Sequence, residues 1–409
     1  MPEDALPERD PALEAAQRAR ASTHFSVART TLRDTDERTL SEQVELTEIE
    51  APPFGEATRG VRMGELMEDA GLVDITTDAV GNVCGWLAEP GPGPSPLVVS
   101  AHLDTVFPAG TDVRVRREGN RFHGPGIGDD GRGLAALLAV ARTMSQAGIR
   151  LVSPVLFVAT VGEEGVGNLR GVRHLFGADG AGNDACGFIS LDGAGHESIV
   201  NAGVGSRRYR VTATGPGGHS WADFGLANPL HALGDAIASL RRIKPGEGAT
   251  LTVGRIAGGT SVNAIPEDVW LEMEVRSTSE GRLDSLDQDV HERLTLAIAD
   301  ENSRRKKGSA ALTLDIEDIG SRPGGSTSAQ APLVQAAIAA TEGLGYRAQL
   351  IPSSTDANVP MSLGIPSVTL GAGGGMGRAH TLDEWYDNTN GTLGIERAIL
   401  TLMTLDGMG

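Results

Sequence analysis

The strongest constraint on the fold is a set of short apolar runs separated by a helix-forming segment. The runs PLVVSAHLDTVF (96–107), SPVLFVATVG (153–162) and CGFISLDGAG (186–195) are typical of strands buried on both faces. Between the first two, GRGLAALLAVARTMSQAGI (131–149) predicts a helix that stops near Gly148. Buried strands that alternate with helices indicate an α/β domain with a mostly parallel sheet. In such sheets, functional groups gather beyond the carboxyl ends of the strands.

The pattern changes after about Gly203. The next elements follow the order strand, helix, strand, strand, helix, strand, which is the order of a ferredoxin-like unit. They are SRRYRVTATG (206–215), NPLHALGDAIASLRRI (228–243), TLTVGRIAGG (250–259), VWLEMEVRS (269–277), LDQDVHERLTLAIADEN (286–302) and ALTLDIEDI (311–319).

The α/β pattern resumes after SRPGGSTSAQ (321–330), which its composition predicts to be a linker. A predicted helix, APLVQAAIAATEGLG (331–345), precedes a predicted strand, IPSVTLGAG (365–373). We therefore expect an α/β domain formed by residues 1–203 and 325–409, with a small domain of residues 204–324 inserted into it.

Composition excludes several classes of function. The formal net charge of −19 disfavours nucleic acid or an acidic membrane surface as a partner. The two cysteines, Cys84 and Cys186, form no CxxC, so a disulfide framework is excluded and a zinc site must use His and carboxylate ligands. The N-terminal stretch MPEDALPERDPALEAAQRAR lacks the apolar segment of a signal peptide, and no run is long enough for a transmembrane helix. We expect a soluble cytoplasmic protein.

One motif points to a different chemistry. GIGDDG (126–131) matches the G-x-G-x-x-G fingerprint of dinucleotide-binding loops. A pyrophosphate at the start of the following helix would meet the like charges of Asp129 and Asp130. The interpretation as an oxidoreductase is therefore disfavoured.

Acidic residues and histidines stand at or just after the predicted strand ends, or at a helix start on the same edge. Singly, each has an ordinary explanation: a polar His-x-Asp pair, a helix N-cap, a turn-forming Asp before Gly, or a loop histidine. Together, these groups would repel one another unless cations were present. Two zinc ions would offset that repulsion. The residues are His102, Asp104, Asp129, the adjacent pair Glu163 and Glu164, Asp192 and His380.

These stretches resemble motifs of the M20 family of di-zinc metallopeptidases and amidohydrolases. SAHLDTV (100–106), GPGIGDDGRGLAALL (124–138), TVGEEGVGN (160–168) and SLDGAG (190–195) resemble its first four metal motifs, and AHTLDEW (379–385) resembles the last. GPGGHS (215–220) and GGTSVNAIP (258–266) resemble motifs of its lid domain, and IEAPPFGE (49–56) resembles peptidase T. The resemblance covers nearly the whole chain.

The resemblance implies a zinc-exopeptidase-type sheet with flanking helices, an inserted ferredoxin-like lid domain and two bound zinc ions. Cobalt or manganese would also fit the implied ligands. His102 and Asp192 would bind the first ion, and Glu164 and His380 the second. Asp129 would bridge the two ions.

Further roles follow from the same resemblance. Glu163 would be the general base that acts on a bridging water, and Asp104 would orient His102. The peptide bond between Asp129 and Asp130 is expected to be cis.

The lid domain and the last loop supply residues implied to bind substrate. His219 would stabilise the oxyanion of the tetrahedral intermediate, and Asn263 would contact the substrate. Arg276 and Arg378 would hold the substrate, Arg276 through its carboxylate. The ordinary alternatives are an exposed turn histidine for His219 and a surface ion pair with Glu272 or Glu274 for Arg276. Because His219 and Asn263 act from the partner subunit in many members, a homodimer through the lid domain is expected.

Three functions remain open at this stage. The first is an exopeptidase, similar to peptidase T, that hydrolyses di- and tripeptides. The second is an amidohydrolase that acts on N-acyl amino acids with the same metals. The third is a non-catalytic metal-binding scaffold, which Glu163 argues against because a scaffold has no need of a base beside its ligands.

Overall fold

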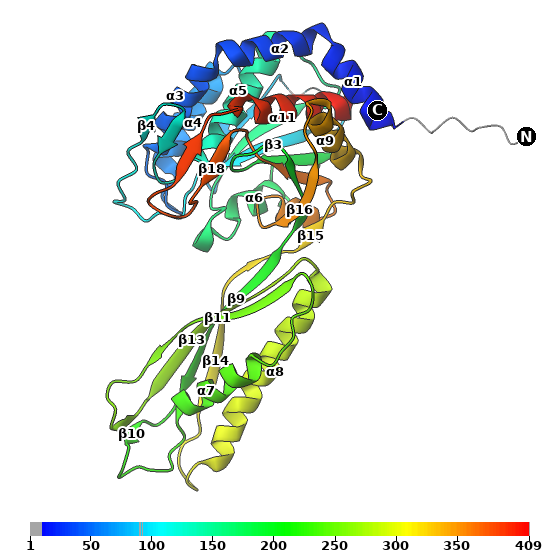
Figure 1. The fold of residues 1–409 in the computed structure, drawn as a ribbon. Helices are drawn as coiled ribbons and strands as arrows, with labels where there is room; N and C mark the ends of the chain where they lie inside the picture. Colours follow the sequence, from blue (N-terminus) through cyan, green and yellow to red (C-terminus); the bar gives the residue numbers. More distant parts are fainter. Residues whose placement is uncertain (1–9, 90, 92, 409) are drawn as a thin grey trace, which may run out of the picture. The chain divides into compact units, whose positions relative to one another are not determined.

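The computed structural model describes residues 10–89, 91 and 93–408, which form two compact units (Figure 1). One unit contains the residues up to Gly203 and from Ser326 onward, and the other contains Val204–Gly325. Residues 1–9 of the N-terminal stretch, for which we expect no signal peptide, lie outside the described residues. Within the described residues, no helix is both long and apolar enough to cross a lipid bilayer.

The first unit is built on a nine-stranded sheet in the order β1-β2-β6-β3-β7-β17-β8-β15, with β16 paired to β8. The central pairs β6–β3, β3–β7 and β7–β17 are parallel, which confirms the predicted mostly parallel sheet. Its strands are β1 (Val73–Thr77), β2 (Val83–Trp86), β3 (Leu97–His102), β6 (Val155–Thr160), β7 (Gly187–Leu191), β8 (Ser198–Gly203), β15 (Gly325–Ser326), β16 (Gln349–Ser353) and β17 (Ser367–Leu370).

Both faces of this sheet are covered by helices, so its central strands β3, β6 and β7 are buried throughout and mostly apolar. In β6, Val155, Phe157 and Ala159 join the core beneath α2, α4, α5, α9 and α11, whereas Leu156 and Val158 join the core beneath α6 and α10. Figure 1 shows α5 and α11 on one side of the sheet and α6 on the other. The helices are α1 (Pro11–Ala21), α2 (Thr23–Asp34), α3 (Asp36–Thr47), α4 (Ala57–Asp69), α5 (Gly131–Ala147), α6 (Arg170–Leu175), α9 (Pro332–Gly343), α10 (Asn358–Ser362) and α11 (Gly391–Asp406), with a 3-10 turn at Gly165–Gly167.

The helix predicted over residues 131–149 is α5, and both of its ends have a local cause. The carboxylate of Asp130 accepts a hydrogen bond from the N–H of Gly133 at 3.0 Å and caps the first turn. Gly148 adopts the left-handed conformation, with φ of 64°, and ends the helix.

Several short strands were not predicted. β16 parallels β8, and a separate antiparallel sheet has the order β18-β19-β5-β4. The stretch 321–330 was predicted to be a linker, which is wrong in part because it contains the end of β14 and all of β15. The strands of the small sheet are β4 (Arg116–Glu118), β5 (Arg121–His123), β18 (Gly375–Gly377) and β19 (Trp385–Asp387).

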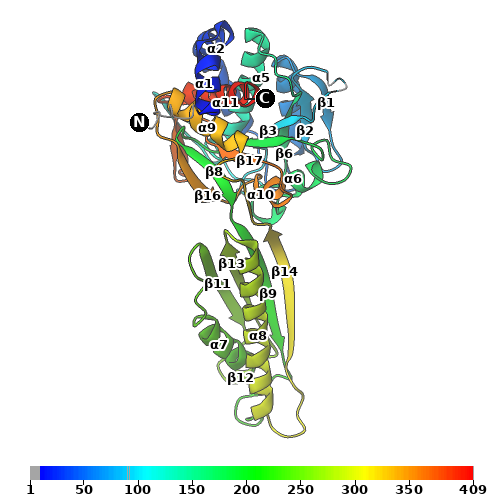
Figure 2. The same ribbon diagram turned by 90° about the vertical axis from the view of Figure 1, so that its right-hand side faces the viewer.

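The second unit confirms the ferredoxin-like order. Its four-stranded antiparallel sheet runs β11-β13-β9-β14. Figure 2 shows α7 and α8 against this sheet, and alternate residues of β13 such as Leu271 and Val275 are buried with them. Its elements are β9 (Gly205–Thr214), β10 (Gly218–His219), α7 (Pro229–Leu240), β11 (Ala249–Gly258), β12 (Ala264–Ile265), β13 (Asp268–Ser277), α8 (Glu280–Arg304) and β14 (Thr313–Arg322).

Candidate metal centre

Five segments of the first unit bring their histidines and carboxylates to one edge of the large sheet. His102 is the last residue of β3, Glu163 and Glu164 follow β6, and Asp192 follows β7. These three strands are parallel, so their carboxyl ends lie at the same edge. Asp129 precedes α5, and His380 lies in the loop between β18 and β19.

The carboxylate of Asp129 lies between two imidazoles. Its Oδ1 is 3.1 Å from Nε2 of His102, and its Oδ2 is 3.1 Å from Nε2 of His380. Nε2 of His380 is also 2.9 Å from Oε1 of Glu164. One oxygen faces each ring, which is the disposition that a carboxylate shared by two cations requires.

In the part of the chain that the structure describes, three groups of residues have ligand atoms that all lie within 4.8 Å of one another. Every metal ligand implied by the resemblance occurs in at least one group. The groups also include Glu163 and Asp130, so the distances alone do not separate ligands from their neighbours. The groups are His102 with Glu163 and Glu164, His102 with Asp130 and Asp192, and Asp129 with Glu164 and His380.

The pKa values of Asp192, His102 and His380 in this cluster are all raised. Burial, together with the charges of Asp129 and Asp130, raises the pKa of Asp192 well above its usual range. Burial alone would lower the pKa of His102, but the surrounding carboxylates outweigh it and raise that pKa well above its usual value. Contacts with Asp129 and Glu164 raise the pKa of His380 to about 10. Bound cations can replace these protons, so the donor set fits divalent metal ions.

Asp104 contacts the imidazole of His102, which it is expected to orient, through its backbone carbonyl. Nδ1 of His102 donates to the backbone carbonyl of Asp104 at 2.9 Å, whereas the nearest carboxylate oxygen is 3.7 Å away. The strand β3 ends at His102, two residues before Asp104. The carbonyl contact still leaves Nε2 of His102 free to face Asp129.

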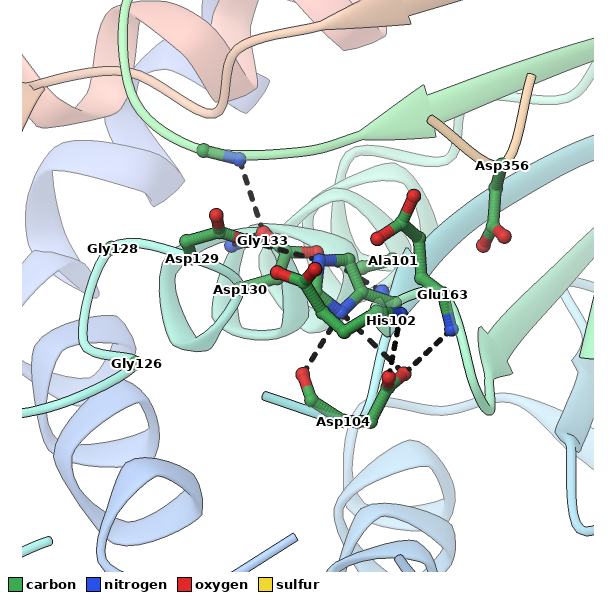
Figure 3. A network of polar contacts seen from close by, with 12 residues as sticks. Ala101, His102, Asp104, Gly126, Gly128, Asp129, Asp130, Gly133, Glu163 and Asp356 are labelled. Carbon is green, nitrogen blue, oxygen red and sulfur yellow. Dashed lines mark hydrogen bonds and ion pairs between the residues drawn. The ribbon is translucent and has the colours of Figure 1, made fainter. Parts of the chain in front are cut away.

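The carboxylate of Asp104 holds the glutamate pair instead. It accepts hydrogen bonds from the backbone N–H groups of Glu163 at 2.9 Å and Glu164 at 2.7 Å. Figure 3 shows the N–H of Glu163 turned to Asp104 and its carboxylate turned the opposite way. Asp104 therefore fixes the turn that aims both glutamates.

Asp130 is distinguished from Asp129 by its partners. Its carboxylate accepts from the backbone N–H groups of His102 at 3.0 Å, Gly133 at 3.0 Å and Gly193 at 3.2 Å. These three donors occupy both oxygens, so Asp130 is a poorer candidate ligand than Asp129. The peptide bond between the two aspartates is cis, which confirms that prediction.

Comparison with known proteins now identifies the chain. Residues 98–403 match the model of peptidase family M20/M25/M40, which covers well over half of the sequence. The chain belongs to this family. It is therefore an M20-type hydrolase, as the sequence predicted.

Individual relatives agree with this assignment. A succinyl-diaminopimelate desuccinylase from Leptothrix cholodnii is 28% identical over 279 residues, which are 63% of this chain and 70% of the relative. The crystal structure of aminopeptidase PepT from Bacillus cereus has a TM-score of 0.74 at 22% identity and covers 90% of this chain and 98% of its own. The YXEP protein of Bacillus subtilis, described as a dinuclear metal binding peptidase of the M20 family, has a TM-score of 0.67 at 16% identity over 91% of this chain and 98% of its own. The two structural likenesses show the fold.

The predicted lid residues of this M20 chain lie in the second unit. Gly218 and His219 form β10, which pairs with β12, and the backbone carbonyl of Asn263 accepts from Ser220 N–H at 3.0 Å. Nδ1 of His219 accepts from the N–H of Trp221 at 3.1 Å. The structure therefore brings His219 and Asn263 together within this unit.

The two predicted arginines are engaged in ion pairs. Arg276 donates to Glu274 through two guanidinium N–H groups, one of them at 3.2 Å, as the ordinary alternative for this residue expects. Nη2 of Arg378 lies 3.1 Å from a carboxylate oxygen of Asp383, and both side chains are exposed.

Sequence reasoning missed Glu384. This residue stands in the last metal motif of the M20 chain, four positions after His380, and is fully buried. Burial raises the pKa of Glu384 to about 7, although hydrogen bonds from three backbone N–H groups oppose that shift. The motif contains two adjacent carboxylates, Asp383 and Glu384, and no local pattern distinguishes the buried one from the exposed one.

Close packing and backbone conformation explain glycines in and just after the stretch GIGDDG (126–131). A Cβ atom on Gly133 would lie 2.1 Å from a carboxylate oxygen of Asp130 and 2.4 Å from the carbonyl oxygen of Leu191. Gly126 has φ of 78°, which favours glycine. These glycines let the loop before α5 approach the ends of β3 and β7.

The substitution Gly133→Ala should lower the free energy of unfolding by about 1–3 kcal/mol, because the added methyl group overpacks the contact with Asp130. The matched control is Gly234→Ala in α7, where an added Cβ meets nothing within 4 Å among the described residues. That control should raise the free energy of unfolding by about 0.5–1 kcal/mol. Equilibrium denaturation in urea measures both changes, and a shift of the same sign in both variants would contradict the packing argument.

Proposed function

We propose that this chain hydrolyses an amide bond in short peptides, as a metal-dependent di- or tripeptide exopeptidase similar to peptidase T. The observation that carries the proposal is the carboxylate of Asp129, which directs one oxygen at His102 and the other at His380, each at 3.1 Å. The likeness in fold to aminopeptidase PepT supports the choice of short peptides.

The proposed ligands divide between two ions. His102 and Asp192 would hold the first ion, Glu164 and His380 would hold the second, and Asp129 would contact both. Imidazole and carboxylate ligands suit zinc, and they also accept cobalt or manganese. When bound, two such ions polarise the substrate carbonyl and lower the pKa of a water molecule.

The side chains of this chain perform the proton transfers in the proposal. Glu163 accepts the proton of the attacking water and later gives it to the leaving amine. Because Asp104 accepts hydrogen bonds from the N–H groups of both Glu163 and Glu164, the backbone positions of the base and the ligand are fixed relative to each other. In this proposal Glu163 carries the proton because it is not one of the metal ligands.

His219 stabilises the oxyanion of the tetrahedral intermediate in this proposal. Its Nδ1 accepts a hydrogen bond from Trp221 N–H, so in the neutral ring Nε2 carries the hydrogen that it donates. Asn263 contacts the substrate beside it. For Arg276 and Arg378 to bind a substrate carboxylate, their ion pairs with Glu274 and Asp383 must first open.

A second candidate function uses the same site. An N-acyl amino acid could be hydrolysed by the same groups, and the similarity to a succinyl-diaminopimelate desuccinylase favours this reaction. The two functions differ in what recognises the group on the N-terminal side of the scissile bond. A non-catalytic scaffold is the remote alternative, and an intact base beside the ligand set argues against it.

The zinc-loaded chain should hydrolyse members of a panel of di- and tripeptides and N-acyl amino acids, with its best substrates among the peptides. Treatment with a chelator should abolish turnover, and zinc, cobalt or manganese should restore it. Chromatographic detection of the released amino acids measures both effects. Preference for the N-acyl amino acids would support the second function, and hydrolysis of no member would contradict both.

Glu163→Gln and Glu164→Gln should separate the two jobs of the glutamate pair. Glu163→Gln should keep both metal ions and lose about 10²–10⁴-fold in kcat, because only proton transfer is removed. Glu164→Gln should lose metal. Elemental analysis and steady-state kinetics on the same preparations measure this, and the opposite pattern would reverse the assignment of the pair.

We also propose a homodimer through the lid domain, in which His219 and Asn263 act on the site of the partner chain. Sedimentation equilibrium should then give the mass of two chains of 42.5 kDa. Mixing inactive His219→Ala with inactive Glu163→Gln should restore activity, since one site of each mixed dimer has both groups. A monomer, or a mixture that stays inactive, would contradict this part of the proposal.

A further inference from the structure

The carboxylate of Glu384 is fully buried and is surrounded by backbone N–H groups of the loop that carries Asp129. Oε2 accepts from Gly126 at 3.0 Å, and Oε1 accepts from Gly128 at 2.8 Å and from Asp129 itself at 3.0 Å. Both oxygens are therefore occupied by the protein. Among the described residues, Glu384 belongs to none of the groups that could hold a metal ion.

Glu384 also belongs to the loop that carries His380. Its own N–H donates to the carbonyl of Thr381 at 3.1 Å, and its carbonyl accepts from Gly124 N–H at 3.0 Å. One residue thus joins the segment 124–129 to the segment 380–384 through side chain and backbone together. These are the segments whose side chains meet where His380 faces Asp129 at 3.1 Å.

The contact leaves little space. A Cβ atom on Gly128 would lie 3.2 Å from Oε1 of Glu384 and 2.9 Å from Cε of Met376. The loop can approach the carboxylate this closely only because residue 128 is glycine. The position of Asp129 is therefore set by a specific contact rather than by the loop alone.

We propose that Glu384 is a positioning residue for the metal centre: by fixing the backbone of Asp129 against the His380 loop, it aims the Asp129 carboxylate between the two imidazoles. It contacts no metal ion. The inference rests on the proposed function, because it assumes that the proposed ligands hold two ions. It goes further because it makes the affinity for those ions depend on Glu384, which is not a ligand.

A purely structural carboxylate would give a different result, and the chain contains one for comparison. Oδ1 of Asp78 accepts from the backbone N–H groups of Val80, Gly81 and Asn82, each at 3.0 Å, in the turn between β1 and β2. None of the proposed ligands lies in this turn. Oδ2 of Asp78 also accepts from Nδ2 of Asn82 at 2.7 Å. Asp78→Asn and Glu384→Gln therefore each replace one acceptor oxygen of a hydrogen-bonded carboxylate by an NH₂ group.

The experiment measures zinc affinity of the metal-free full-length chain by competition with a chromophoric chelator, alongside thermal unfolding. Glu384→Gln should weaken the binding of zinc by about 10–100-fold, in the range known for groups that support metal ligands. Asp78→Asn should bind two zinc ions with wild-type affinity, even if its unfolding temperature falls as much as that of Glu384→Gln. Two ions bound by Glu384→Gln at wild-type affinity, or an equal loss in Asp78→Asn, would overturn the proposal.

A second variant alters the same contact by changing Gly128 instead of Glu384. Gly128→Ala presses a methyl group against Glu384 and leaves the carboxylate in place. It should also weaken zinc binding, so the proposal can be tested if Glu384→Gln does not fold. Wild-type affinity in a folded Gly128→Ala would count against the proposal. If the wild-type chain itself bound no zinc, the proposed function would fail, and this inference would fail with it. If the wild-type chain bound zinc and the variants bound it equally well, only this inference would be overturned.

Discussion

The candidate metal centre depends on one carboxylate placed between two imidazoles. Asp129 directs one oxygen to His102 and one to His380, and these two histidines come from segments 278 positions apart in the chain. A shift of the backbone at Asp129 would therefore disturb both halves of the site. Much of the surrounding structure serves to prevent such a shift.

Three buried carboxylates provide that support, and each holds backbone rather than a ligand side chain. Asp104 accepts from the N–H groups of Glu163 and Glu164, Asp130 from three N–H groups that include His102, and Glu384 from three that include Asp129. Carboxylates near the proposed metal ligands thus differ in what they contact. Those saturated by backbone N–H groups set the geometry, whereas Asp129, which faces two imidazoles, is the proposed shared ligand.

The sequence predicts the centre of the fold better than its edges. β3, β6 and β7 are buried throughout because helices cover both faces, and their mostly apolar sequences make this visible. β16 is largely exposed and contains a proline, and β18 has only three residues, two of them glycine, so neither carries a strand pattern. These strands depend on pairing with distant segments, which no local pattern records.

The candidate site shows the same division. The carboxylates and histidines at the strand ends could be found because strand ends are predictable, and the family motifs named their roles. The contacts of Asp104 and Glu384 could not be found, since each depends on backbone N–H groups of segments far away in sequence. The adjacent glutamates illustrate both cases: their types were informative, but the turn that aims them is held by a carboxylate 59 residues earlier.

Anomalous diffraction at the zinc edge, from crystals of the zinc-loaded chain, tests the central claim most directly. The account predicts two peaks roughly 3.5–4 Å apart, both in contact with the Asp129 carboxylate, one beside His102 and Asp192 and the other beside Glu164 and His380. A single peak, two peaks that do not share Asp129, or an ion held by Glu163 would contradict it.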